Sequence, residues 1–142
     1  MAAAEVDFTE ALTVLESISY DYLSSEDRKG MDAVKVMCQI DIDICEMMAS
    51  DFCDFIDHSQ KISFAVDEEE AVGHFRESRA ALVRMKEKTA VMKTKIDAVE
   101  VDHLPAEIKG DFVGMKTYVH EFEKSLEEWI AMMDLALDDA GL

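Results

Sequence analysis

The stretch QIDIDIC, residues 39–45, decides the fold, because its alternation of apolar and acidic residues has the two-residue period of a β-strand. No turn signal flanks it, and the roughly thirty residues around it follow a helical pattern. On a helix, Val34, Cys45 and Phe52 fall on one face. We therefore expect a helix, with Asp41 near the middle of its buried face and Asp43 on the opposite, exposed side.

Four segments of the chain repeat apolar residues at intervals of three and four, which is the period of one helix face. The last segment carries such a stripe from Ile108 to Leu137, and Trp129 belongs to it. The segments are expected to form helices near 5–24, 31–58, 67–100 and 105–139. Short connections favour antiparallel neighbours. The predicted fold is all-α, an elongated up-down antiparallel four-helix bundle in a single domain over residues 1–142.

The expected helix boundaries rest on local sequence signals. The stretch SSEDRKG, residues 24–30, contains capping serines and Gly30, so we expect the first helix to end near Ser24. Asp67 followed by Glu70 resembles a capping box, and Pro105 suits the first turn of the last helix.

The formal net charge of −18 restricts the classes of partner. Phosphate backbones and anionic membranes both require a basic surface, so neither direct nucleic-acid binding nor membrane binding is expected. The N-terminal residues lack the basic and apolar regions of a signal peptide, and no apolar run is long enough to span a membrane. The three cysteines are interpreted as reduced, buried residues of a cytoplasmic protein.

Several polar residues fall on predicted core faces, namely Asp41, His74, Ser78 and Thr89. A buried ionised carboxylate must be paired, hydrogen-bonded or protonated. This cluster predicts either a small-ligand, proton or metal site around Asp41 and His74, or a hydrogen-bonded core aspartate that fixes the helix register.

The second predicted helix also has an apolar arc covering more than half of its circumference, and Ile40, Ile44 and Met47 extend it. Either this helix is central in the bundle or a second chain covers part of it. We expect the second arrangement, a homodimer that uses these three residues as its interface.

Motifs for catalysis and cofactor binding are weak, so we expect no enzyme activity, no catalytic residues and no cofactor. The sequence lacks a nucleophile elbow, a glycine-rich phosphate loop and an H-E-x-x-H motif. Histidine phosphotransfer domains are bundles of this size, but GHFRES around His74 has Arg76 and Glu77 where their Leu and Lys would stand.

Three short spacings of acidic residues and histidine resemble metal ligands but are common by chance in so acidic a chain, so no metal site is expected. These spacings are Glu100 with His103, Asp51 and Asp54 with His58, and Glu70 with His74.

Charge is distributed unevenly along the chain. Residues 84–95, RMKEKTAVMKTK, are basic, and this stretch either pairs with acidic neighbours in the bundle or forms a docking patch. Acidic residues gather elsewhere, and those expected to form a partner-binding surface are Glu68, Glu69, Glu70, Glu121, Glu123, Glu127, Glu128, Asp138 and Asp139.

These features predict a non-enzymatic interaction module that binds, inhibits or escorts a basic protein partner. Rows of carboxylates can imitate nucleic acid, and flexible methionines suit an adaptor or chaperone surface. The alternative is a small-ligand or metal-responsive bundle built around Asp41 and His74.

Overall fold

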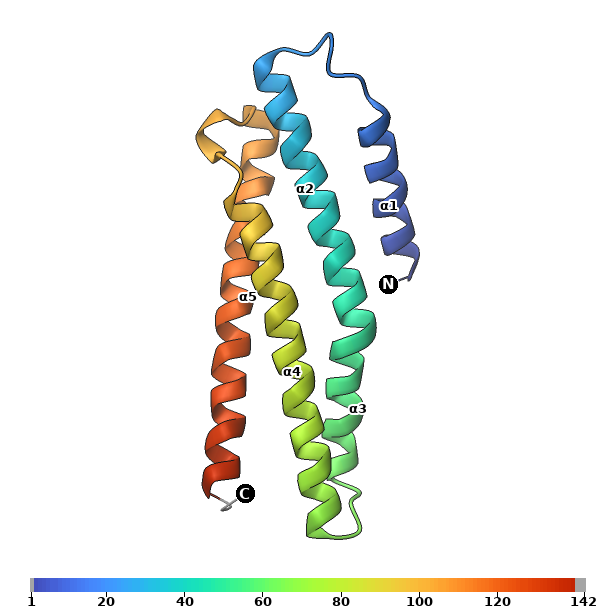
Figure 1. Ribbon diagram of the computed structural model, residues 1–142, viewed down its shortest axis with the longest axis vertical. Helices are drawn as coiled ribbons and strands as arrows, with labels where there is room; N and C mark the ends of the chain where they lie inside the picture. The colour runs from blue at the N-terminus through green and yellow to red at the C-terminus, as the bar shows by residue number, and fades with distance from the viewer. Residues whose placement is uncertain (1, 140–142) are drawn as a thin grey trace.

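The computed structural model describes residues 2–139, and all regular structure in this range is helical (Figure 1). The elements are α1 (Ala2–Ser17), α2 (Ser25–Met47), the π-helical turn η1 (Met48–Phe52), α3 (Cys53–Ile62), α4 (Glu68–Asp97), the 3₁₀ turn η2 (Val101–His103) and α5 (Ala106–Asp139). Elements α2, η1 and α3 follow one another without a break. The all-α prediction is confirmed, and QIDIDIC lies inside α2.

The boundary between the first two helices differs from the prediction. Element α1 ends at Ser17, and α2 already begins at Ser25. The Ser24 hydroxyl accepts a hydrogen bond from the backbone N–H of Asp27 at 3.1 Å, so Ser24 starts a helix and does not end one. Gly30, expected to act as a break, is buried inside α2.

The predicted start of the third helix is confirmed. The Asp67 carboxylate accepts a hydrogen bond from the backbone N–H of Glu70 at 2.9 Å, which caps the first turn of α4. The Glu70 carboxylate in turn accepts from the N–H of Val66 at 2.7 Å. This reciprocal pair is a close variant of the capping box.

Consecutive long helices run in alternating directions along the molecule (Figure 1). Three helical segments share the hydrophobic core, which contains Ala33, Ile40, Met47, Leu82, Met85, Met92, Ile96, Leu104, Phe112, Val119 and Leu126. None of these residues comes from α1, which packs on α2 and has no comparable contact with α4 or α5. Element α1 is therefore an outer helix and not an equal member of a four-helix core.

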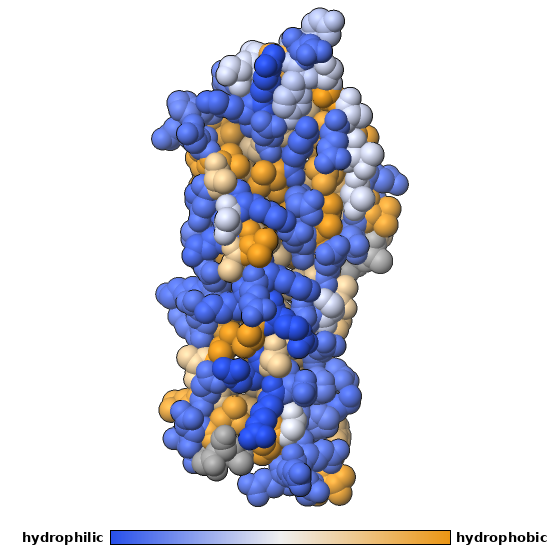
Figure 2. Space-filling view, viewed as in Figure 1, coloured by the Kyte–Doolittle hydropathy of each residue, from blue (hydrophilic) through white to orange (hydrophobic). Residues whose placement is uncertain are grey.

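The surface is predominantly hydrophilic on the face drawn in Figure 2, with apolar patches between the charged side chains. Within residues 2–139, no helix combines the length and the apolar character needed to cross a membrane.

One described glycine permits two segments to pack closely, and three others have open space beside them. A Cβ atom on Gly30 would lie 3.0 Å from Cγ of Pro105 and 3.3 Å from Cδ1 of Ile108. At Gly73, Gly110 and Gly114, which are exposed helix positions, a Cβ atom would meet nothing within 4 Å.

We therefore expect alanine at Gly73, Gly110 or Gly114 to raise the free energy of unfolding by about 0.5–1 kcal/mol, because alanine favours the helix. Alanine at Gly30 should give no such gain, since the start of α5 would have to move. Urea denaturation of the four single variants compares them directly. A gain at Gly30 equal to the others would contradict the close packing of α2 against Pro105.

Candidate protein-interaction site

Element α4 carries cations that pair with acidic residues on both sides of it. Toward α2, η1 and α3, the ion pairs are Lys95–Asp43, Lys88–Asp51, Arg84–Asp51 and Arg84–Asp54. Toward α5, they are Lys93–Glu123, Lys86–Glu127 and Arg79–Asp134. On both sides the partner's residue number falls as the α4 number rises, which is the register of antiparallel helices. The cations facing α5 are spaced seven residues apart, as flanking charges in coiled coils are.

This pairing decides between the two alternatives for the basic stretch and corrects one expectation. The basic stretch 84–95 is engaged inside the bundle and is not a free docking patch. Glu123 and Glu127, expected on the partner-binding surface, bind Lys93 at 2.5 Å and Lys86 at 2.9 Å. Both glutamates therefore join α5 to α4.

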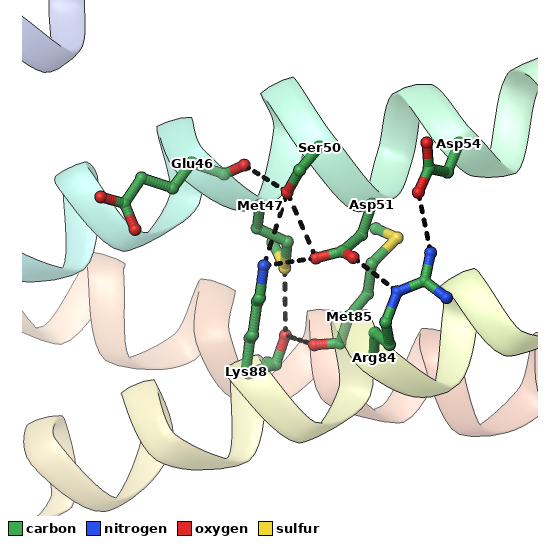
Figure 3. A network of polar contacts seen from close by, with 9 residues as sticks. Glu46, Met47, Ser50, Asp51, Asp54, Arg84, Met85 and Lys88 are labelled. Carbon is green, nitrogen blue, oxygen red and sulfur yellow. Dashed lines mark hydrogen bonds and ion pairs between the residues drawn. The ribbon is translucent and has the colours of Figure 1, made fainter.

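Among residues 2–139, the carboxylate that is buried is that of Asp51, which is only 4% exposed (Figure 3). It lies on the π-helical turn η1 and accepts from Nε of Arg84 at 2.8 Å, with Nζ of Lys88 at 2.6 Å from its other oxygen. Burial alone would raise the pKa of Asp51, but the hydrogen bonds and charges of Lys88 and Arg84 together hold it below its ordinary value. The Asp51 carboxylate therefore stays ionised and ties η1 to α4.

The expected roles of Asp41 and Asp43 are wrong. Asp41 is half-buried, and no hydrogen bond or ion pair of its side chain occurs among the described residues. Burial raises the pKa of Asp41, and the Asp41 charge adds to burial in raising the pKa of the Cys38 thiol. Asp43, expected to be exposed, is half-buried and binds Lys95 at 2.5 Å.

Asp41 and His74 do not form a common site. Nδ1 of His74 lies 3.1 Å from Nδ1 of His58 on α3. His58 follows Asp41 by seventeen positions along one continuous helical segment, which corresponds to roughly 25 Å. His74 itself is half-buried, not fully buried as expected.

Ser78 and Thr89 are fully buried, as predicted. Thr89 donates its hydroxyl to the Met85 carbonyl at 2.8 Å, and the Ser78 hydroxyl lies 3.2 Å from that of Ser59. Every buried side-chain nitrogen or oxygen in the described range has a hydrogen-bond partner. These two residues are thus satisfied core residues that do not extend a ligand site.

The predicted oligomer face is also wrong. Ile40 and Met47 are 0% and 1% exposed in the core, and Ile44 packs against that core. The wide apolar arc of α2 exists because α1 covers one side of the helix while α4 and α5 cover another. The helix is central, and its arc gives no reason to add a second chain.

The spacings of acidic residues and histidine that resemble metal ligands do not form a cluster in the described range. Asp51 and Asp54 bind Arg84, and His103 lies 3.8 Å from Glu100 at an exposed position. No group of three or more potential ligand side chains with metal-binding geometry occurs in residues 2–139. The cysteines are free thiols; Cys38 and Cys45 are half-buried, but Cys53 is exposed, contrary to expectation.

The sequence analysis missed an apolar groove between α3 and α5. Element α3 packs on α4, and α4 packs on α5, but direct contact between α3 and α5 is minor at most. The resulting groove has a volume of about 440 Å³, and its lining is almost entirely apolar. The lining residues are Phe55, Phe75, Leu82, Trp129, Met132, Met133 and Ala136. We call this feature the α3–α5 groove.

Half-exposed large side chains form the α5 wall of this groove. Trp129 is 40% exposed and Met132 is 60% exposed, although the stripe of the last helix predicted Trp129 in the core. The adjacent stripe on α5 is acidic, because Glu121, Glu128 and Asp139 lie on the same side of the helix as Met132. All three carboxylates are exposed, and the one ion pair found among them joins Glu128 to Lys124 on the same helix at 3.7 Å.

The remaining residues of the predicted acidic surface lie away from this wall or have another role. Glu68, Glu69 and Glu70 occupy the first turn of α4, where negative charge favours the helix dipole. Asp138 is exposed near the end of α5. Binding of a partner by these residues stays a prediction.

Comparison of the chain with protein-family models, with curated proteins and with solved structures found no match to any of them. The functional conclusion therefore rests on the geometry and charge of the molecule.

Proposed function

We propose that this protein is a non-enzymatic interaction module that binds a basic, amphipathic helix of a protein partner in the α3–α5 groove. The observation that supports the proposal is an apolar groove with an acidic stripe along one wall. This proposal keeps the basic partner expected from the net charge and replaces a general acidic surface with a defined site.

The shape and chemistry of the groove favour a helix. Two helices form its walls and α4 forms its floor, which is the position that a further helix would take in a bundle. Its volume of about 440 Å³ accepts a few apolar side chains, such as those at positions i, i+3 and i+4 of a docked helix. Met132 and Met133 are flexible and polarisable, so they adapt to the side chains that enter.

The acidic stripe beside the groove favours a basic partner. Glu121, Glu128 and Asp139 follow the Met132 side of α5, next to the groove lining. Six cations of α4 are paired within the bundle, and Arg76 is the one for which no ion pair is found among the described residues. Lysine or arginine residues on the solvent side of a docked helix would lie near this acidic stripe. Attraction between them increases the association rate and selects against acidic helices.

Binding is testable with a designed peptide, because Trp129 is the single tryptophan of the chain and lines the groove. We expect a lysine-rich amphipathic peptide of about 15 residues to shift the Trp129 emission to shorter wavelength in a saturable manner. A peptide of the same composition, scrambled so that it has no apolar face, should not do so. Raising the salt concentration should weaken binding, because exposed charges are screened over about 8–10 Å at physiological ionic strength.

Charge reversal in the acidic stripe can be compared with the same change of charge on α1. The double variant Glu128→Lys and Asp139→Lys should bind the peptide more weakly through slower association. Glu10→Lys with Glu16→Lys on α1 changes the net charge equally at exposed positions far from the groove lining. Equal weakening by both double variants, or equal binding of the scrambled peptide, would reject the groove as the binding site.

A further inference from the structure

Two half-buried histidines, His58 on α3 and His74 on α4, lie close together where these helices pack, and the proposed function does not use them. Nδ1 of His58 and Nδ1 of His74 lie 3.1 Å apart, and the ring centroids are separated by 5.3 Å. Only one proton fits between two ring nitrogens at this distance, so at least one of them presents a lone pair to the other. The pair is partly accessible, since the His74 side chain is 22% exposed.

This separation suits two nitrogens that share one metal ion. Imidazole nitrogens bind Zn²⁺ at roughly 2.0–2.1 Å, so two of them at bond angles between square-planar and tetrahedral values lie roughly 2.9–3.4 Å apart. The observed 3.1 Å falls within this interval. We propose that His58 and His74 bind a divalent transition metal such as Zn²⁺ or Ni²⁺ through their Nδ1 atoms. Binding requires each ring to turn until its Nδ1 lone pair points at the common ion, and the proton between the two Nδ1 atoms to move to Nε2 of its own ring.

The surroundings of the pair support a cation. Oε1 of Glu70 lies 3.9 Å from Nε2 of His74, the nitrogen left free when Nδ1 binds a metal. The other oxygen of Glu70 is held by the backbone N–H of Val66, so the position of this carboxylate is fixed. At 3.9 Å the Glu70 carboxylate does not accept a hydrogen bond from Nε2, but its negative charge favours a cation bound to the His74 ring.

The two histidines leave the other coordination positions to water, because no third ligand side chain lies in place within residues 2–139. We therefore expect an affinity in the micromolar range, weaker than that of closed structural zinc sites. The ion would link α3 to α4. The inference is independent of helix binding in the groove, since it concerns only the seam between these two elements.

Calorimetric titration of the chelator-treated full chain with ZnCl₂ and with NiCl₂ tests the site. Binding should become at least tenfold weaker in His58→Gln and in His74→Gln, because each change removes one of two ligands. Glutamine preserves polarity and size, and circular dichroism verifies that each variant is folded. Glu70→Gln should weaken binding less than loss of a ligand does, since it removes a charge but no metal bond.

Matched controls use the other histidines and the exposed thiol. His103→Gln, His120→Gln and Cys53→Ser should bind the metal as the unaltered chain does. In ¹⁵N spectra of the imidazoles, Zn²⁺ should shift the signals of His58 and His74 and leave those of His103 and His120 in place. Unchanged binding in His58→Gln or His74→Gln, loss of binding in Cys53→Ser, or no binding up to about 1 mM metal would overturn the proposal.

Discussion

Replacement of Asp51 by alanine is expected to lower the free energy of unfolding by about 2 kcal/mol at neutral pH. The change leaves Arg84 and Lys88 without their buried partner at the junction of η1 and α4. The loss is smaller than for a fully buried ion pair, because the Arg84 and Lys88 side chains are 42% and 47% exposed and can reach water. Urea denaturation followed by circular dichroism measures it.

Asp41 provides the opposite case on the same continuous helical segment. Its pKa is raised by burial, so its ionised form destabilises the folded state above that raised pKa. Asp41→Asn should therefore increase stability at neutral pH, and the gain should disappear in acid, where Asp41 is protonated in both states. The pKa of Asp51 is lowered, so the stability it contributes is present above its unfolded pKa of about 3.9 and is lost as the pH falls through its folded pKa.

The two aspartates can be compared in one series of unfolding experiments from neutral to acid pH. An unchanged free energy of unfolding in Asp51→Ala, or a lower one in Asp41→Asn, would show that the buried carboxylate has been assigned to the wrong residue.

A second large effect is expected in the α3–α5 groove. Met132→Asp should weaken binding of the lysine-rich amphipathic peptide at least tenfold, because docking would bury a carboxylate against apolar side chains. Leu135→Asp is a matched control on the same helix. Met132 and Leu135 are 60% and 62% exposed, but Leu135 does not line the groove. Both variants should fold equally well.

Titration monitored by Trp129 fluorescence compares the two variants with the unaltered chain. Equal affinity of the Met132 and Leu135 variants would mean that the peptide binds by net charge alone.

Local signals in the sequence were sufficient to predict the helical character of the chain and one helix cap, but not the boundary between α1 and α2. Asp67 and Glu70 identify the start of α4, because the capping hydrogen bonds involve residues only three or four positions apart. Ser24 was misread, since serine at a boundary caps the following helix as readily as it follows the preceding one.

The buried carboxylate was assigned to the wrong aspartate for a geometric reason. Two different neighbours cover α2, so the middle of its apolar arc, near Val34 and Cys45, is not the middle of the core. On a helix, Ile40, Met47 and Asp51 lie within about 40° of one another, and this narrower face is the one that α4 and α5 cover. A periodic pattern shows which side of a helix is buried, but it does not show which element covers that side.

The groove was missed because it depends on a contact that does not form. Trp129 fits the apolar stripe of the last helix, and nothing in that stripe indicates that α3 would stay apart from α5. Likewise, Glu123 and Glu127 look like solvated residues in the sequence, and only the register of α5 on α4 places them opposite Lys93 and Lys86.

The most direct test of helix docking uses the methionine methyl groups, since the chain has ten methionines distributed along it. In spectra of protein labelled with ¹³C at these methyl groups, the lysine-rich amphipathic peptide should shift the signals of Met132 and Met133. The signals of Met31 and Met37, which lie on α2 outside the groove lining, should stay in place. Shifts at Met31 and Met37 without shifts at Met132 and Met133 would contradict the proposed docking of a basic helix in the α3–α5 groove.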